Sequence, residues 1–156
     1  ADLEITPGFN ALTYVAFGGL KTAGKMAQIL LDAGADVNAA TKMANQTALM
    51  LACEQRAKEV VLLLLQCGAD VHLHDDFGRT ALITSVMEWL YGAPDPEIVR
   101  ALLEAGADPF VKASSEDHER DIAGKRPLEI IQGQRQTKKT KEIVTILEEA
   151  EAKWQK

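Results

Sequence analysis

The sequence predicts an all-α fold, a solenoid in which pairs of short helices stack side by side. The first observation is a repeat, because the tripeptide Gly-Ala-Asp occurs at 34–36, 68–70 and 106–108. The second is that each copy ends an apolar stretch with helical spacing: "MAQILLDAGAD", "VVLLLLQCGAD" and "IVRALLEAGAD". The third is composition, since leucine and alanine dominate while aromatic residues make up only 5%.

Each expected helical pair begins and ends on a recognisable signal. "TAL" at 47–49 and 80–82 starts two units one 33-residue period apart, and its threonine is suited to cap a helix. The weaker copies "NAL" at 10–12 and "RPL" at 126–128 start the outer two, with a proline at the first helical position of the latter. In the third unit "PDPEIV" opens the second helix with an aspartate cap. The glycines of the three Gly-Ala-Asp copies stand where helices end in the left-handed conformation.

These motifs resemble the ankyrin repeat family, whose 33-residue units open on "TPLHxA" and close on "LLxxGAD". The resemblance covers four units between roughly Phe9 and Ala150, close in the central two and degenerate in the outer two. It implies helix-turn-helix units linked by short β-hairpin fingers. It also implies one domain over 1–156, with units at approximately 1–38, 39–72, 73–110 and 111–156. Some units are longer than the 33-residue period, and their additional residues fall at turns. The longest insertion lies within 112–125, and its role stays open.

The ends of such an array need polar surfaces, because a single unit cannot bury its apolar face alone. The final stretch "TKEIVTILEEAEAKWQK" becomes steadily more polar. We therefore expect the array to end there, as a monomer, with Trp154 lying back on the last hydrophobic layer.

Composition narrows the classes of function. The 156 residues fit one globular domain, with 47% apolar and 26% charged residues. A net charge of −6 argues against a nucleic acid partner, and no apolar run approaches the ~18 residues of a membrane span. Two cysteines are too few for a disulfide scaffold, so we expect reduced thiols and a cytoplasmic or otherwise intracellular location. The chain begins at Ala1 without a methionine, so a removed signal sequence stays open.

The resemblance implies a protein–protein interaction module, because ankyrin arrays meet partners on their concave face, made of the finger tips and the exposed side of each first helix. We expect partner contacts there from Met43, Gln46, Glu54, Gln55, Asp76, Phe77, Arg79, Met87, Glu88, Trp89 and Tyr91. Tryptophan, tyrosine and arginine often carry binding energy at interfaces. The alternative for Trp89 is that it fills the longer turn between two helices. The sequence does not name the partner.

A metal-binding or enzyme-associated domain is the alternative from another class. "HLHDD" places His72, His74, Asp75 and Asp76 within five positions, and His118 could approach from the next finger. Zinc needs three or four converging ligands. The family register instead assigns Asp75 and Gly78 to a finger turn. We therefore expect neither a metal nor a cofactor.

Catalysis finds no support in the sequence. No serine or cysteine lies in a nucleophile motif, and "FGGLKTAGK" lacks the spacing of a phosphate-binding loop. We expect Cys53 to be the more buried of the two cysteines and an unfavourable site for a thiolate. A further alternative is that the chain is a regulatory fragment or effector domain of a larger ankyrin protein.

Overall fold

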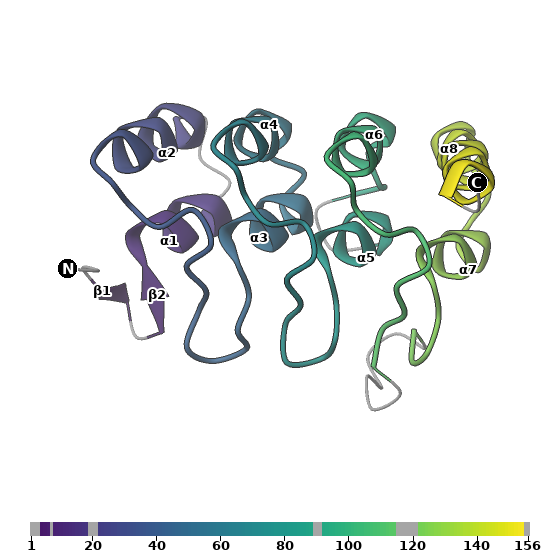
Figure 1. The fold of residues 1–156 in the computed structure, drawn as a ribbon, viewed down its shortest axis with the longest axis horizontal. Helices are drawn as coiled ribbons and strands as arrows, with labels where there is room; N and C mark the ends of the chain where they lie inside the picture. Colours follow the sequence, from purple (N-terminus) through teal and green to yellow (C-terminus); the bar gives the residue numbers. More distant parts are fainter. Residues whose placement is uncertain (1–3, 7, 19–21, 89–91, 115–121, 155–156) are drawn as a thin grey trace.

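The computed structural model describes residues 4–6, 8–18, 22–88, 92–114 and 122–154, and within these ranges the helices form successive antiparallel pairs (Figure 1). The first helices of the pairs form one row and the second helices a row above them, with the fingers projecting below. The elements in chain order are β1 (Glu4–Thr6), β2 (Phe9–Asn10), α1 (Ala11–Phe17), α2 (Ala23–Asp32), α3 (Ala48–Glu54), α4 (Lys58–Gln66), α5 (Ala81–Val86), α6 (Pro96–Glu104), α7 (Pro127–Gln132) and α8 (Lys138–Trp154).

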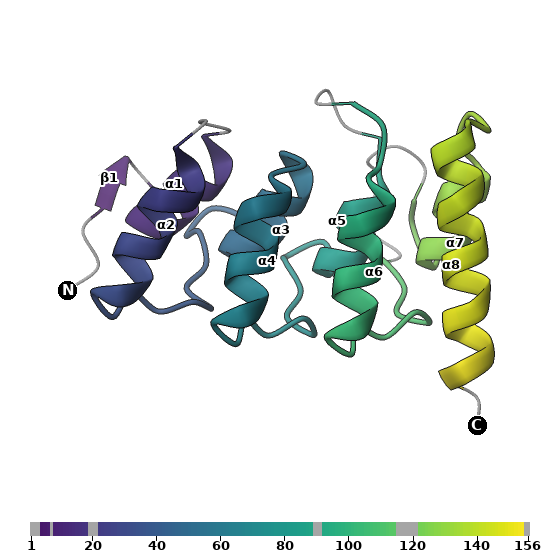
Figure 2. The ribbon, with the colours of Figure 1, turned by 90° about the horizontal axis from the view of Figure 1, so that it is seen from above.

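Each row is continuous from one pair to the next. Along the first row α1 packs on α3, α3 on α5 and α5 on α7, and along the second row α2 packs on α4, α4 on α6 and α6 on α8. Figure 2 shows the second-row helices side by side, with α8 the longest. This arrangement confirms the predicted helical solenoid. The short antiparallel pair of β1 and β2, with Thr6 opposite Phe9, was not foreseen.

The predicted caps are present at the first helices. The hydroxyl groups of Thr47 and Thr80 accept hydrogen bonds from backbone N–H groups three residues later, at 3.3 and 3.4 Å. The side chain of Asn10 does the same at 2.9 Å. In α7 the cap position holds Arg126, and the carboxylate of Glu129 accepts from its backbone N–H at 2.8 Å. That hydrogen bond is the main reason the pKa of Glu129 is lowered.

The Gly-Ala-Asp repeat has a physical cause in the turn that follows each second helix. Its glycines have φ of 86°, 83° and 91°, which residues with a Cβ rarely adopt. The aspartates then each accept a hydrogen bond from the N–H two residues later, at 2.8–2.9 Å. One bond also crosses between units, because the Asn38 side chain accepts from the N–H of Asp70 at 2.8 Å.

Backbone hydrogen bonds join each finger to the next. The N–H of Lys42 donates to the carbonyl of Gly8 at 2.9 Å, and that of Asp76 donates to Ala44 at 3.1 Å. The N–H of Ser114 then donates to Phe77 at 3.0 Å. Isolated β-bridges, Ala40 with Thr47 and His74 with Thr80, close two of the fingers. The fingers therefore form a linked row whose spacing is fixed by the main chain.

The hydrophobic core runs along the whole array between the two rows of helices. Its largest fully buried side chains are Leu12, Leu49, Met50, Leu51, Leu64, Leu82, Ile83, Met87, Ile98, Leu102, Ile131 and Ile143. The expectation for Trp154 is wrong, because this residue is 50% exposed. It ends α8 and borders an open groove against α6 instead of covering the last layer.

The finger closed by the bridge between His74 and Thr80 depends on one buried carboxylate. Asp75 is buried, and its Oδ1 accepts hydrogen bonds from the N–H groups of Phe77 and Arg79, both at 2.9 Å. Gly78 has φ of 70°, and a Cβ at this position would lie 3.0 Å from the backbone nitrogen of Ser114. The predicted turn roles of Asp75 and Gly78 are confirmed.

Replacing Asp75 with alanine is expected to destabilise the protein by ~2 kcal/mol, because two buried N–H groups lose their acceptor. Urea unfolding followed by circular dichroism measures the change. The neighbouring Asp76→Ala is the matched control, since the Asp76 side chain is exposed and its loss should cost less than ~0.5 kcal/mol. Equal destabilisation by both substitutions would contradict the role given to Asp75.

Candidate partner-binding surface

The fingers and the free ends of the first helices hold most of the predicted contact residues. Met43, Asp76, Phe77 and Glu88 are exposed. Gln46, Glu54 and Gln55 are half-buried. Trp89 and Tyr91 lie outside the described residues. A partner contact by any of these residues stays a prediction.

Arg79 was predicted to be an accessible finger residue, and the structure buries it. Its guanidinium carbon lies 4.5 Å from the centre of the Phe77 ring. A cation over an aromatic face is attracted by the ring electrons, which orients the ring. The finger turn directs the Arg79 side chain inward while the Phe77 ring remains partly open to solvent. Arg79 therefore supports Phe77 and does not itself form an open contact surface.

Met87 was also predicted to be accessible, and it is buried. It occupies the C-cap of α5, where the backbone has already left the helical conformation. Its side chain forms part of the wall of a pocket between the ends of α5 and α7. Met87 therefore contributes to this surface as part of the pocket wall and not as an exposed side chain.

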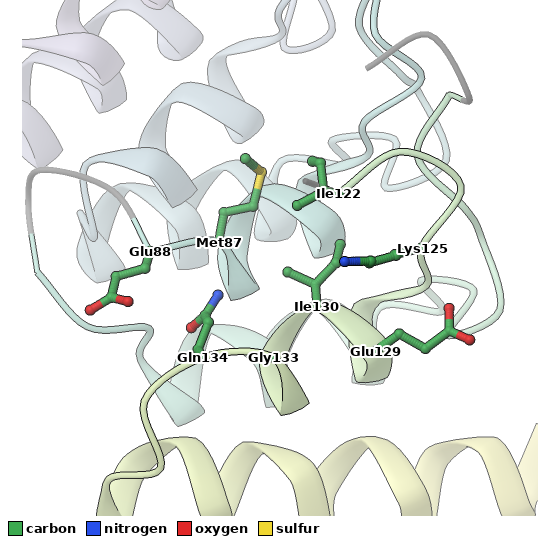
Figure 3. Close-up of a pocket in the computed structure, with 8 residues that line it drawn as sticks. All are labelled: Met87, Glu88, Ile122, Lys125, Glu129, Ile130, Gly133 and Gln134. Atoms are coloured by element: carbon green, nitrogen blue, oxygen red, sulfur yellow. The ribbon is translucent and has the colours of Figure 1, made fainter. Parts of the chain in front are cut away.

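The pocket between α5 and α7 has a volume of about 280 Å³ (Figure 3). Its apolar wall comes from Met87, Ile122 and Ile130. Figure 3 shows the carboxylate of Glu88 at one end, with Lys125 and Glu129 toward the other. The remaining lining residues are Gly133 and Gln134. The pocket thus combines an apolar centre with charged ends.

A missing side chain helps to explain why the pocket lies where the fourth pair meets the third. Seven residues after each first-helix cap the chain has Phe17, Glu54 and Met87 in the first three pairs, and Gly133 in the fourth. Gly133 has an ordinary helical φ of −73°. A Cβ there would meet nothing closer than the Ile130 carbonyl oxygen at 3.5 Å. Sequence reasoning missed Ile122, Lys125, Glu129, Ile130, Gly133 and Gln134, although comparing cap positions between units would have pointed to the glycine.

The end of α5, which carries Met87 and Glu88, is held from both neighbouring pairs. The guanidinium of Arg56 donates to the carbonyl oxygens of Ser85 at 2.8 Å and Cys53 at 3.1 Å, and also to Met87. From the other side the amide of Gln134 donates to the carbonyl of Val86 at 2.6 Å. Burial lowers the pKa of Arg56. These bonds satisfy the carbonyl groups that a helix leaves free at its end.

The two cysteines differ as expected. Cys53 is buried and Cys67 is exposed. Burial raises the pKa of the Cys53 thiol to about 12, and the nearby charge of Arg56 offsets only part of this rise. A thiol with that pKa carries almost no thiolate at neutral pH, so Cys53 is unsuited to act as a nucleophile.

The histidines that raised the metal alternative do not converge with other ligands in the described ranges. His72 and His74 are exposed, and the Nδ1 atom of His74 lies 3.2 Å from the Asp75 carbonyl oxygen. The Asp75 carboxylate already accepts two backbone hydrogen bonds. Within the described part of the chain no group of three or more His, Cys, Asp or Glu side chains is placed to hold a metal ion. His118 lies outside that part.

Stacked helical hairpins joined by linked fingers define a class of recognition scaffold, the α-solenoid. The sequence matches the family model for ankyrin repeats, in three copies, over residues 12–113. The chain belongs to the ankyrin repeat family. Ankyrin repeats are generally protein–protein interaction modules, and the family is typically non-catalytic.

Individual relatives agree with this assignment. The human protein "Ankyrin repeat and SOCS box protein 6" is 37% identical over 120 residues, which cover 75% of this chain, and its Pongo abelii counterpart is 36% identical over the same length. An ankyrin repeat-containing protein of Treponema pallidum (strain Nichols) is 33% identical over 88 residues, or 56% of this chain. Each match spans only 28% of the relative's own length.

Among the residues that the structure describes, no helix combines the length and apolar character needed to cross a bilayer.

Replacing Arg56 with methionine is expected to lower the free energy of unfolding by ~2–4 kcal/mol, because three carbonyl groups lose a charged donor. Chemical unfolding provides the measurement. Arg100→Met serves as the control, since the pair of Arg100 with Glu142 at 3.2 Å is exposed and its loss should cost ~1 kcal/mol or less. If the two substitutions cost the same, the α5 end is not held in the way described.

The thiols give a second test of the described geometry. At pH 8 a disulfide reagent such as Ellman's should react with Cys67 in the folded protein and with Cys53 only after unfolding, since burial keeps Cys53 protonated. Absorbance counts the thiols before and after adding guanidinium. Rapid reaction of both thiols in the folded protein would contradict the burial of Cys53.

Proposed function

We propose that this chain is a protein-binding module without catalytic activity of its own, and that a partner polypeptide contacts its fingers and the pocket between α5 and α7. The observation that carries the proposal is the pocket itself. It opens among the ends of the first helices and residues of the last finger, which is the side of the array that the family uses for recognition.

The pocket can hold one large side chain. Its volume of about 280 Å³ lies at the small end of the ~300–1,000 Å³ range of pockets that hold drug-sized molecules. Met87, Ile122 and Ile130 supply an apolar wall, and charged groups stand only at its ends. The matching ligand is a large apolar side chain in a segment that carries polar groups on either side of it.

The finger tips provide a second area of contact. Met43 and Phe77 are large, exposed and apolar, and each lies in a finger that is hydrogen-bonded to its neighbour. Because the fingers are linked, these side chains are presented at fixed spacing and little entropy is lost when a partner binds. Arg79 contributes by orienting the Phe77 ring.

Other features are consistent with a monomeric module inside the cell. A cysteine exposed to solvent, Cys67, suits a reducing compartment. The net charge of −6 favours proteins over nucleic acids as partners.

Filling the pocket tests the proposal. Gly133→Leu adds a large side chain at a residue that lines the pocket, and the helical φ of this residue allows it without backbone strain. Binders are first selected from a displayed library of random peptides on the wild-type chain. We expect their affinity to fall at least ~tenfold for Gly133→Leu, because the anchoring side chain loses its place.

Gly133→Ala is the matched control for this experiment. It makes the same change of backbone freedom but adds only a methyl group, so affinity should stay within about twofold and stability should rise by ~0.5 kcal/mol. Thermal melting verifies that both variants are folded. Unchanged affinity in a folded Gly133→Leu protein would refute the pocket as the anchor. The same conclusion would follow if the binders lost affinity only for Arg100→Glu, a substitution between the outer helices.

A further inference from the structure

The two ends of the array present different surfaces. At the C-terminal end the exposed positions of α8 include Lys141, Thr145, Glu148 and Ala152, which is the polar surface expected of a terminal unit. At the N-terminal end Tyr14 and Met26 are each 40% exposed and Ile29 is 67% exposed. Trp154 of the last pair is also 50% exposed, but it borders the groove against α6. The large apolar side chains that are open toward an end of the array are therefore those of the first pair.

The same positions are covered in the later pairs. Tyr14 is the fourth residue after its helix cap, and that position is buried in each later pair, as Leu51, Thr84 and Ile130. Met26 stands eight residues before the turn glycine of its unit, and the matching residues Val60 and Ile98 are buried. Ile29, five residues before that glycine, corresponds to Leu63 and Ala101, which are half-buried.

The direction in which these side chains point follows from α2 itself. Its Gly24 and Ala27 are buried, and a Cβ at Gly24 would lie 2.5 Å from the Glu59 carboxyl of α4. This side of α2 therefore faces α4. Met26 and Ile29 each follow one of these residues by two positions, and residues two apart lie on different sides of a helix. They face away from α4, on the side that in α4 and α6 meets the preceding outer helix.

We infer that Tyr14, Met26 and Ile29 form an N-terminal stacking face, and that its occupant is a further helical hairpin of the same type, located upstream of α1 in the intact polypeptide. In the later pairs of the described chain, the corresponding face is covered by the preceding hairpin. A helical hairpin therefore has the shape that fits this face. The matched relatives are longer than the matched region, which spans 28% of their length.

A second copy of the chain is a poorer occupant. Stacked head to tail, it would place the apolar face against Lys141 and Glu148 of α8. Those charges would lose water without gaining partners from Tyr14, Met26 or Ile29, which is costly. An upstream hairpin with an apolar side has no such cost.

Cysteine reporters test this inference. Cys67 is replaced by serine, and so is any cysteine outside these 156 residues, so that the buried Cys53 is the one native thiol left. Ile29→Cys then reports on the stacking face, and Met43→Cys, at a position 79% exposed, is the open control. The rate of maleimide labelling is measured on the 156-residue chain and on the protein made from its complete reading frame. In the longer protein we expect Ile29→Cys to react at least ~tenfold more slowly and Met43→Cys within about twofold of its rate.

Three outcomes would overturn the inference. Ile29→Cys could react equally fast in both proteins, which would show that the face stays open. Its protection could rise with concentration in the 156-residue chain, which would identify a second copy as the occupant. The reading frame could also lack a helical hairpin directly upstream. The result is independent of the pocket, since Gly133 lies at the opposite end of the array.

Discussion

A hairpin of two short helices that is apolar on both sides cannot be stable alone, and this constraint determines the rest of the architecture. Within the described chain each first helix spans only six or seven residues, too few to persist in water. Buried side chains such as Leu51, Leu82 and Ile131 remove their apolar surface from water only when a neighbouring pair covers them. Stacking is therefore the source of stability, and each pair depends on the next.

Hydrogen bonds set the geometry of a stack whose stability comes from apolar contacts. Apolar packing alone would tolerate small rotations between pairs, whereas polar bonds are directional. The finger-to-finger bonds, the Asn38 side chain and the Arg56 guanidinium each connect one pair to the next. Arg56 and Gln134 approach the end of α5 from opposite neighbours, so the residues that border the pocket are fixed by three pairs together.

The sequence allowed prediction of what depends on local rules and missed what depends on the stack. Caps at Thr47 and Thr80, and the turn roles of Asp75 and Gly78, follow from backbone geometry within a few residues, and they were predicted correctly. The burial of Arg79 and Met87 depends on how a finger or helix end turns against its neighbours, and periodicity carries no information about that. Predicting the pocket would have required a comparison between units. The absence of a side chain at Gly133 is recognised only when it is compared with Phe17, Glu54 and Met87 at the same position of the other units.

The features that bear on function are departures from the repeat. A perfect array would offer equivalent grooves along its whole length and two ends that differ only in direction. Gly133 removes a side chain and leaves a pocket at one place, and Tyr14, Met26 and Ile29 keep at the first pair an apolar face that a terminal unit would replace with polar groups. Both departures leave the α-helical backbone intact. The repeat supplies a rigid frame, and single substitutions within it determine where the frame can bind and where it can be extended.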